Sequence, residues 1–134
     1  MKTIFLDSSF TVALIDTTDQ NHEEAVALSK IYAREVFLTT SGVLLEIGNT
    51  FSRKFKSEAS KTIRELLNAD DVHTVHINET FLRRGLELYN SRLDKSWSLV
   101  DCVSFIVMKE RNISVALTFD THFEQAGFTV LVPS

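Results

Sequence analysis

The stretch Thr3–Ile15, with the sequence TIFLDSSFTVALI, combines two kinds of pattern. Its first part, Thr3–Leu6, consists of β-branched, aromatic and aliphatic residues, which is typical of a buried strand. Asp7 follows, and the apolar segment Ser9–Ile15 predicts a short helix directly after the strand. A strand that leads straight into a helix is the repeating unit of a parallel sheet with helices packed on it.

The same alternation continues along the chain. Further strands are expected at Val36–Thr39, Val72–Ile77, Val115–Thr118 and Thr129–Val132. Between them, helices are expected at His22–Ala33, Ser41–Phe51, Ser60–Ala69, Glu79–Leu93 and Leu99–Arg111, with another short helix after Asp120. Strands separated by helices require right-handed crossovers. We therefore expect an α/β fold with a central, mainly parallel sheet of five strands and helices on both faces.

Length and composition limit the class of protein. The chain has 134 residues, of which 44% are hydrophobic and 24% are charged, so we expect one globular domain over residues 1–134 and no extensive disorder. No apolar run approaches 18 residues, and the N-terminal segment lacks a signal-peptide pattern, so neither a membrane span nor secretion is expected. The single cysteine, Cys102, fits a reducing cytoplasm.

The charge of the chain is unevenly distributed. The formal net charge is −4, which excludes a general basic field that would attract nucleic acid. Residues 53–64 nevertheless carry five basic side chains and one acid, Glu58. The five are Arg53, Lys54, Lys56, Lys61 and Arg64. This stretch could hold phosphate groups. Alternatively, Arg53 and Lys54 stabilise a helix C-terminus and the other bases are solvated.

Four carboxylates stand out by their positions. Asp7 and Asp120 each come directly after a predicted strand, and ligands of parallel sheets bind beyond the carboxyl ends of the strands. Glu46 and Asp101 lie in helical segments whose neighbours are mostly apolar. Burial of an unpaired carboxylate is costly, so such acids are usually protonated, hydrogen-bonded or bound to metal.

Each acid also has a purely structural interpretation. Asp7 and Asp120 could cap the helices that follow them, and Asp101 could form a capping box with Ser98. Glu46 could be a partly solvated residue on the flank of its helix. The order of the elements along the chain nevertheless places all four near one edge of the sheet, which four independent caps would not explain.

The chain resembles the PIN-domain ribonucleases, especially the small VapC-type toxins of type II toxin–antitoxin pairs. Four stretches carry the resemblance in the order of that family: IFLDSSFTVALI at 4–15, SGVLLEIGNTF at 41–51, DKSWSLVDCVSF at 94–105 and LTFDTHFEQAGF at 117–128. The resemblance implies a three-layer α/β/α fold and metal-dependent hydrolysis of RNA phosphodiester bonds. It also implies a cognate antitoxin, received by the helical pair that contains the basic stretch, and a homodimer.

Matched position by position, the resemblance makes Asp7, Glu46, Asp101 and Asp120 the catalytic and metal-binding residues. Two hydroxyl residues, Ser8 and Thr118, match positions that support them, and Arg53, Lys54 and Lys56 are candidates for RNA binding. A site made only of carboxylate oxygens suits Mg²⁺ or Mn²⁺ rather than zinc. His122 and Asp94 are expected to be a residue at a helix start and a solvated turn acid, respectively.

Other functions remain to be weighed. A housekeeping PIN-domain nuclease without an antitoxin, or a catalytically silent PIN-like binding module, would share most of these motifs. A phosphatase of the haloacid dehalogenase type requires a second Asp two residues after Asp7, where this chain has Ser9. A phospho-accepting receiver domain requires paired acids after the first strand and an acceptor Asp after the third, where this chain has His76-Ile77-Asn78.

Overall fold

A computed structural model describes residues 2–133 of the chain. The elements in chain order are β1 (Thr3–Leu6), α1 (Ser8–Ile15), α2 (His22–Ile31), β2 (Val36–Thr40), α3 (Ser41–Thr50), α4 (Lys56–Asn68), β3 (Val72–Val75), α5 (Glu79–Ser91), α6 (Leu99–Glu110), β4 (Val115–Leu117), α7 (His122–Gln125) and β5 (Thr129–Val130). This alternation confirms the α/β class. Among these helices, none is long and apolar enough to cross a bilayer.

The five strands form one sheet in the order β3-β2-β1-β4-β5, and every pairing is parallel. β1 lies at the centre, where Phe5 is opposite Leu38 of β2 on one side and Ala116 of β4 on the other. All strands therefore point their carboxyl ends to the same edge. Residues that follow β1, β2 and β4 emerge next to one another although they are far apart in the sequence.

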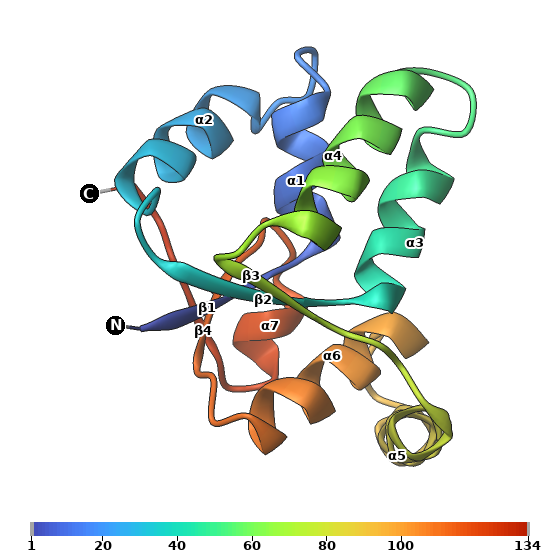
Figure 1. Cartoon of the computed structure of the whole chain (residues 1–134). Coiled ribbons are helices and arrows are strands. Elements are labelled where there is room, and N and C mark those ends of the chain that lie inside the picture. Colours follow the sequence, from blue (N-terminus) through green and yellow to red (C-terminus); the bar gives the residue numbers. More distant parts are fainter. Residues whose placement is uncertain (1, 134) are drawn as a thin grey trace.

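Helices cover both faces of this sheet (Figure 1). The helices α1 to α4 lie on one side and α5 to α7 on the other, which gives the expected three layers. Successive side chains of β1 alternate between the two faces. Ile4 and Leu6 pack in a cluster with Leu28 of α2, whereas Phe5 packs in a second cluster with Phe105 of α6.

Several helices begin with a capping residue at or near the end of a strand. Asp7 is the N-cap of α1 and accepts a hydrogen bond from the backbone N–H of Ser9 at 3.4 Å. Thr40, the last residue of β2, accepts one from the backbone N–H of Val43 at 3.1 Å and so starts α3. These caps satisfy backbone donors that have no partner within the helix. They bring the helix starts to the carboxyl edge of the sheet.

Two predicted boundaries differ from the structure, by four residues at the start of α4 and by two at the end of β3. The α4 helix begins at Lys56 rather than Ser60, because Phe55 adopts a left-handed conformation (φ 59°) that ends the preceding turn. β3 ends at Val75 rather than Ile77, because the backbone N–H of Ile77 donates to the Ser41 hydroxyl at 2.9 Å instead of to a neighbouring strand. The remaining helix and strand ends fall within two residues of expectation.

The pair α5 and α6 packs unusually closely. A Cβ atom at Gly85 of α5 would overlap the side chain of Val103 in α6, so this position requires glycine for the close approach. α6 in turn is buried along much of its length between α5 and the sheet. The N-terminal turn of α6, which contains Asp101, is thereby held at the carboxyl edge.

Candidate active site

The four acids predicted from the sequence come together at the carboxyl edge of the sheet. Asp7 follows β1 and Asp120 follows the neighbouring β4, while Glu46 lies in the second turn of α3 and Asp101 in the first turn of α6. Burial raises the pKa of Glu46, and the other three acids lie near enough for their charges to raise it further. The expected convergence of the four side chains is therefore present in the structure.

Asp7 is buried and held by two hydroxyl groups. The Thr118 hydroxyl donates to Asp7 Oδ2 at 2.7 Å, and the Ser9 hydroxyl donates to the same oxygen at 2.8 Å. Each hydroxyl also accepts a backbone hydrogen bond, Ser9 from Phe119 at 2.9 Å and Thr118 from Asp120 at 3.0 Å. Because a charged carboxylate can only accept hydrogen bonds, both hydroxyls donate their protons to Asp7.

Burial raises the pKa of Asp7, and the hydrogen bonds from Thr118 and Ser9 only partly oppose the rise. A nearby carboxylate, Asp101, raises the pKa further by repulsion. The charged form of Asp7 is thus disfavoured when no cation is close. Such a carboxylate is suited to bind a positive ion, which would restore the charged form.

Because the pKa of Asp7 is raised, we expect the stability of the metal-free protein to depend on pH through this residue. The folded state binds the Asp7 proton more tightly than the unfolded chain does. The protonated Asp7 therefore contributes its full share to the free energy of unfolding below its ordinary pKa of 3.8. This contribution is lost as the pH rises through the raised pKa of the folded state. The Asp7→Asn variant cannot ionise at this position. Its stability relative to the natural chain should therefore increase as the pH rises above the ordinary value of 3.8.

Urea unfolding of both proteins in EDTA at several pH values would measure this difference. Acids outside the cluster contribute equally to both proteins and cancel in the comparison, whereas relief of repulsion on Glu46 adds to the effect in the same direction. A difference that stays constant over the whole pH range would contradict the prediction.

Glu46 is half-buried and meets α1 through one hydrogen bond. The Ser8 hydroxyl donates to Glu46 Oε1 at 2.8 Å, which ties α3 to the first residue of α1. Burial raises the pKa of Glu46, and this hydrogen bond lowers it in part. The expected supporting role of Ser8 therefore has a contact in the structure, as does that of Thr118.

Asp101 combines the two interpretations that the sequence left open. It forms a capping box with Ser98, in which the Ser98 backbone N–H donates to Asp101 Oδ2 at 3.0 Å and the Asp101 N–H donates to the Ser98 hydroxyl at 3.0 Å. The same Oδ2 lies 2.8 Å from Nδ1 of His122. The cap orients the carboxylate at the start of α6 and does not remove it from the cluster of acids.

Two residues of this cluster were not predicted as members. Ser9 supports Asp7 more directly than Ser8 does, and His122 lies against both Asp101 and Asp120, with its Nδ1 3.1 Å from Asp120 Oδ1. For His122, the signal in the sequence was its position two residues after Asp120, directly after a strand. His122 is the first residue of α7, and its side chain contacts the acids at the carboxyl edge.

The basic residues lie on a different part of the surface. Arg53 and Lys54 belong to the loop after α3, and Lys56 begins α4; all three are exposed. Lys54 is close enough to Asp16, at the C-terminal end of α1, to lower the pKa of that acid, after the larger effect of hydrogen bonds from Thr18. The eight-residue helix α1 is about 12 Å long, and Asp7 is at its other end, so the basic loop lies toward the end of α1 opposite the acids.

Asp94 is a surface residue, as expected. Its carboxylate accepts two hydrogen bonds from the Arg92 guanidinium at 3.0 and 3.1 Å, and the side chain is 62% exposed. Hydrogen bonds from Arg92 lower the pKa of Asp94. It is a solvated acid with its own cationic partner.

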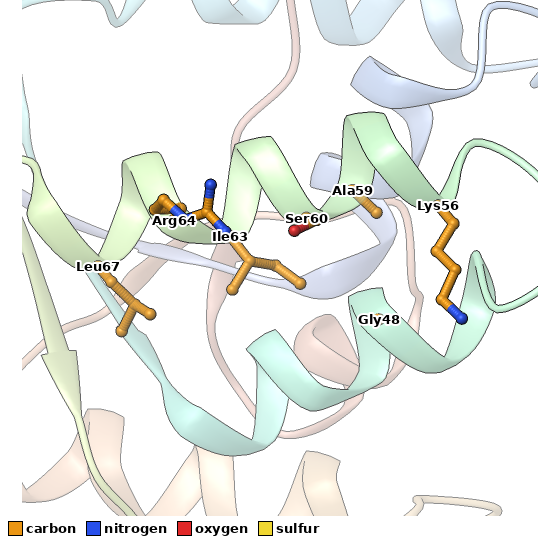
Figure 2. A pocket seen from close by; sticks show the side chains of 7 residues that line it. All are labelled: Gly48, Lys56, Ala59, Ser60, Ile63, Arg64 and Leu67. Atoms are coloured by element: carbon orange, nitrogen blue, oxygen red, sulfur yellow. The ribbon is translucent and has the colours of Figure 1, made fainter.

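A groove of about 360 Å³ runs between α3 and α4. Figure 2 shows its floor, where Ala59, Ile63 and Leu67 of α4 face α3 at Gly48. The basic side chains of Lys56 and Arg64 border the same groove. It therefore combines an apolar floor with a positively charged rim, and it is separate from the cluster of acids.

Comparisons with known proteins agree with this architecture. The chain is 28% identical over 132 residues to the 23S rRNA-specific endonuclease VapC20 of Mycobacterium tuberculosis, a match that covers 97% of this chain and 98% of the relative. The crystal structure of that toxin, described as cleaving the Sarcin-Ricin loop, superposes with a TM-score of 0.88 at 27% identity over 97% of this chain and 99% of the other.

Two more distant structures share the fold. A chain from FitAB bound to an IR36 DNA fragment has a TM-score of 0.67 at 18% identity, covering 97% of this chain and 94% of the other. A chain from VapBC-1 of nontypeable Haemophilus influenzae has a TM-score of 0.64 at 12% identity, with 97% of both chains covered. The PIN domain family model matches residues 4–129. With nearly its whole length matched in this way, the chain belongs to the PIN domain family.

Proposed function

We propose that this protein is an endoribonuclease that hydrolyses RNA phosphodiester bonds and acts as the toxin of a toxin–antitoxin pair in the cytoplasm, where its RNA substrate is found. The observation that carries the proposal is the convergence of Asp7, Glu46, Asp101 and Asp120 at one edge of the sheet. Similarity to VapC20, which is named as a 23S rRNA-specific endonuclease, supports RNA as the substrate class. All four acids are present, which favours an active enzyme over a silent binding module.

The four acids are proposed to bind Mg²⁺ or Mn²⁺. Their carboxylate oxygens are the donors that these hard cations prefer, and the raised pKa values of Asp7 and Glu46 reflect a site that favours added positive charge. When bound, such an ion activates a water molecule and stabilises the charge that develops on the scissile phosphate. The donor set of the chain fits this requirement.

The surrounding residues position the acids for this chemistry. Ser9 and Thr118 fix the orientation of Asp7 through their hydroxyl protons, and Ser8 does the same for Glu46. Ser98 fixes Asp101 at the start of α6. Held in this way, the carboxylates need little reorganisation when the RNA phosphate enters, which is how a preorganised site lowers a barrier.

The proposal is tested by cleavage of RNA under controlled metal conditions. The purified chain should cut 23S rRNA into discrete fragments in Mn²⁺ or Mg²⁺, lose this activity in EDTA, and regain it when Mn²⁺ is added in excess. 16S rRNA in the same reaction serves as a control for unspecific degradation. Equal cleavage with and without the chelator would contradict the metal-dependent mechanism, and no cleavage of any RNA would contradict the nuclease function.

The basic loop is proposed to bind the RNA backbone. Replacement of Arg53, Lys54 and Lys56 by alanine should weaken RNA binding and reduce its dependence on salt concentration, because each lost phosphate contact lowers the slope of log K against log salt by about 0.7 for a single strand. Three lost contacts would lower it by about 2. The rate at saturating RNA should change little, since the loop lies away from the acids.

Binding titrations at several salt concentrations measure this effect. A matched control replaces three exposed basic residues elsewhere, Arg83, Lys109 and Arg111, by alanine. If the affinity and the salt slope of the loop variant equal those of the natural chain, the loop does not contact RNA.

The groove between α3 and α4 is proposed to receive the antitoxin. Its apolar floor and its rim of Lys56 and Arg64 are complementary to a segment with apolar and acidic side chains. Leu67→Glu places a negative charge on the floor at a residue that is 49% exposed, so the fold should tolerate it. We expect this variant to lose antitoxin binding and to keep RNA cleavage.

The measurement is co-purification of the variant with the protein encoded beside this gene, together with its growth phenotype when both are expressed. Ile31→Glu, on α2 and similarly exposed, is the matched control and should retain binding. Undiminished complex formation by Leu67→Glu would exclude this groove as the antitoxin site.

A further inference from the structure

His122 occupies a position between two of the clustered acids. Its Nδ1 lies 2.8 Å from Asp101 Oδ2 and 3.1 Å from Asp120 Oδ1, although these acids come from different elements, α6 and the turn after β4. The three ligand atoms lie within 4.8 Å of one another. The sequence predicted a site made only of carboxylate oxygens, and the structure adds an imidazole nitrogen to it.

The spacing of these atoms matches that of ligands around one ion. With metal–ligand bonds of about 2.1 Å and octahedral geometry, adjacent ligand atoms lie about 3 Å apart. The separations of 2.8 and 3.1 Å from Nδ1 to the two oxygens agree with two such edges. A hydrogen bond from Nδ1–H to a carboxylate has the same length, so the experiment must distinguish the two arrangements.

The second ring nitrogen has a partner of the kind that metal-binding histidines use. His122 Nε2 lies 3.4 Å from the Ser96 hydroxyl. If the ring proton is placed on Nε2, it points to Ser96 and the lone pair of Nδ1 faces the two acids. Histidines that bind metals commonly donate their other ring N–H to an oxygen in this manner.

The backbone around His122 is held in place from two sides. Its own N–H donates to Asp120 Oδ1 at 2.9 Å, which fixes the turn that leads into α7. The next residue, Phe123, is fully buried and packs against Phe105 of α6, with ring centroids 5.0 Å apart. Because Phe105 is one turn after Asp101 on the same helix, this packing also fixes α6 relative to α7.

We propose that His122 is a metal ligand through Nδ1, and that this nitrogen gives the site a preference for Mn²⁺ over Mg²⁺. The inference rests on the proposed function, since it needs a divalent ion held by Asp101 and Asp120. Mg²⁺ strongly favours oxygen donors, whereas imidazole nitrogen is a good ligand for divalent transition metals. Replacement of the nitrogen should therefore affect Mn²⁺ more than Mg²⁺.

Pulsed electron paramagnetic resonance of the Mn²⁺-loaded natural chain tests ligation directly. A bound imidazole nitrogen couples to the Mn²⁺ electron spin, so the natural chain should show a ¹⁴N signal that changes when the protein is labelled with [¹⁵N]histidine. The His122→Asn variant should lose this signal. His73→Gln, which changes an exposed histidine of β3, should keep it.

Metal titrations give a second readout. His122→Asn should weaken Mn²⁺ binding about tenfold or more and Mg²⁺ binding clearly less, so that the ratio of the two dissociation constants shifts toward Mg²⁺. If the natural chain binds Mn²⁺ without any ¹⁴N coupling, the inference fails and the proposed nuclease function is unaffected. If the natural chain binds neither ion, the metal dependence of the proposed function fails as well.

Discussion

The Asp7→Asn variant is expected to cleave RNA about 100- to 1000-fold more slowly than the natural chain while it keeps its fold, which is the loss typical of removing one preorganised electrostatic group. Asp7 is the most buried of the four acids and lies at the centre of the sheet edge, directly after β1. Asparagine has nearly the same shape, but its neutral amide cannot contribute a negative charge to a metal ion.

The fold of this variant should be intact because the neighbouring hydrogen bonds can remain. The hydroxyls of Ser9 and Thr118 both donate to one oxygen of Asp7, and the amide oxygen of asparagine can accept both. Removal of a buried charge with a raised pKa should, in the absence of metal, stabilise the protein near neutral pH. Loss of activity together with a higher melting temperature in EDTA is therefore the expected combination.

Asp94→Asn is a matched control, because it makes the same chemical change at an exposed acid that pairs with Arg92. It should cleave RNA at the natural rate. In cells, expression of the natural chain alone should arrest growth, and Asp7→Asn should relieve the arrest. Activity of Asp7→Asn within a fewfold of the natural chain would show that the acids at this edge do not form the catalytic centre.

The sheet and the positions of the acids could be predicted because they depend on local patterns and on topology. Alternating strand and helix patterns specify parallel strands, and parallel strands place the residues that follow them at one edge. That reasoning located Asp7 and Asp120 correctly. Glu46 and Asp101 could be added because a carboxylate within an apolar helical segment is costly unless it has a partner.

The roles of Ser9 and His122 could not be predicted because they depend on contacts between distant segments. Ser9 is separated from Thr118 by 109 residues, and only the pairing of β1 with β4 brings their side chains within 3.0 Å. His122 meets Asp101 because α6 and α7 pack on the same face of the sheet. Local sequence predicts a helix-start residue at this position, and the structure adds its contacts with Asp101 and Asp120.

Asp101 shows why local and functional interpretations need not compete. The Ser98–Asp101 capping box is present, so the structural interpretation is confirmed. The same box holds the carboxylate at the N-terminus of α6, where it also meets His122. A capping motif and membership in the acidic cluster are therefore two consequences of one side-chain orientation.

Replacement of Phe105 by alanine is expected to lower the free energy of unfolding by about 3–5 kcal/mol, the usual cost of removing a buried aromatic ring. Phe105 is 1% exposed and its ring lies among three others, with centroid distances of 5.0 Å to Phe123, 5.2 Å to Trp97 and 5.6 Å to Phe128. The loss combines the transfer of the ring to water with the cavity it leaves. Leu93→Ala, at a residue that is 87% exposed, should change the free energy by less than about 0.5 kcal/mol.

Phe105 should also matter for catalysis through the two helices that it joins. It lies one turn after Asp101 on α6 and contacts Phe123, the neighbour of His122 on α7. The milder variant Phe105→Leu retains most of the apolar volume and should stay folded at room temperature, so its activity can be measured. We expect slower RNA cleavage and weaker Mn²⁺ binding than in the natural chain, because α6 and α7 no longer hold Asp101 and His122 in one arrangement. If Phe105→Leu melts at a lower temperature but cleaves RNA and binds Mn²⁺ as the natural chain does, the aromatic cluster supports the fold without positioning the site.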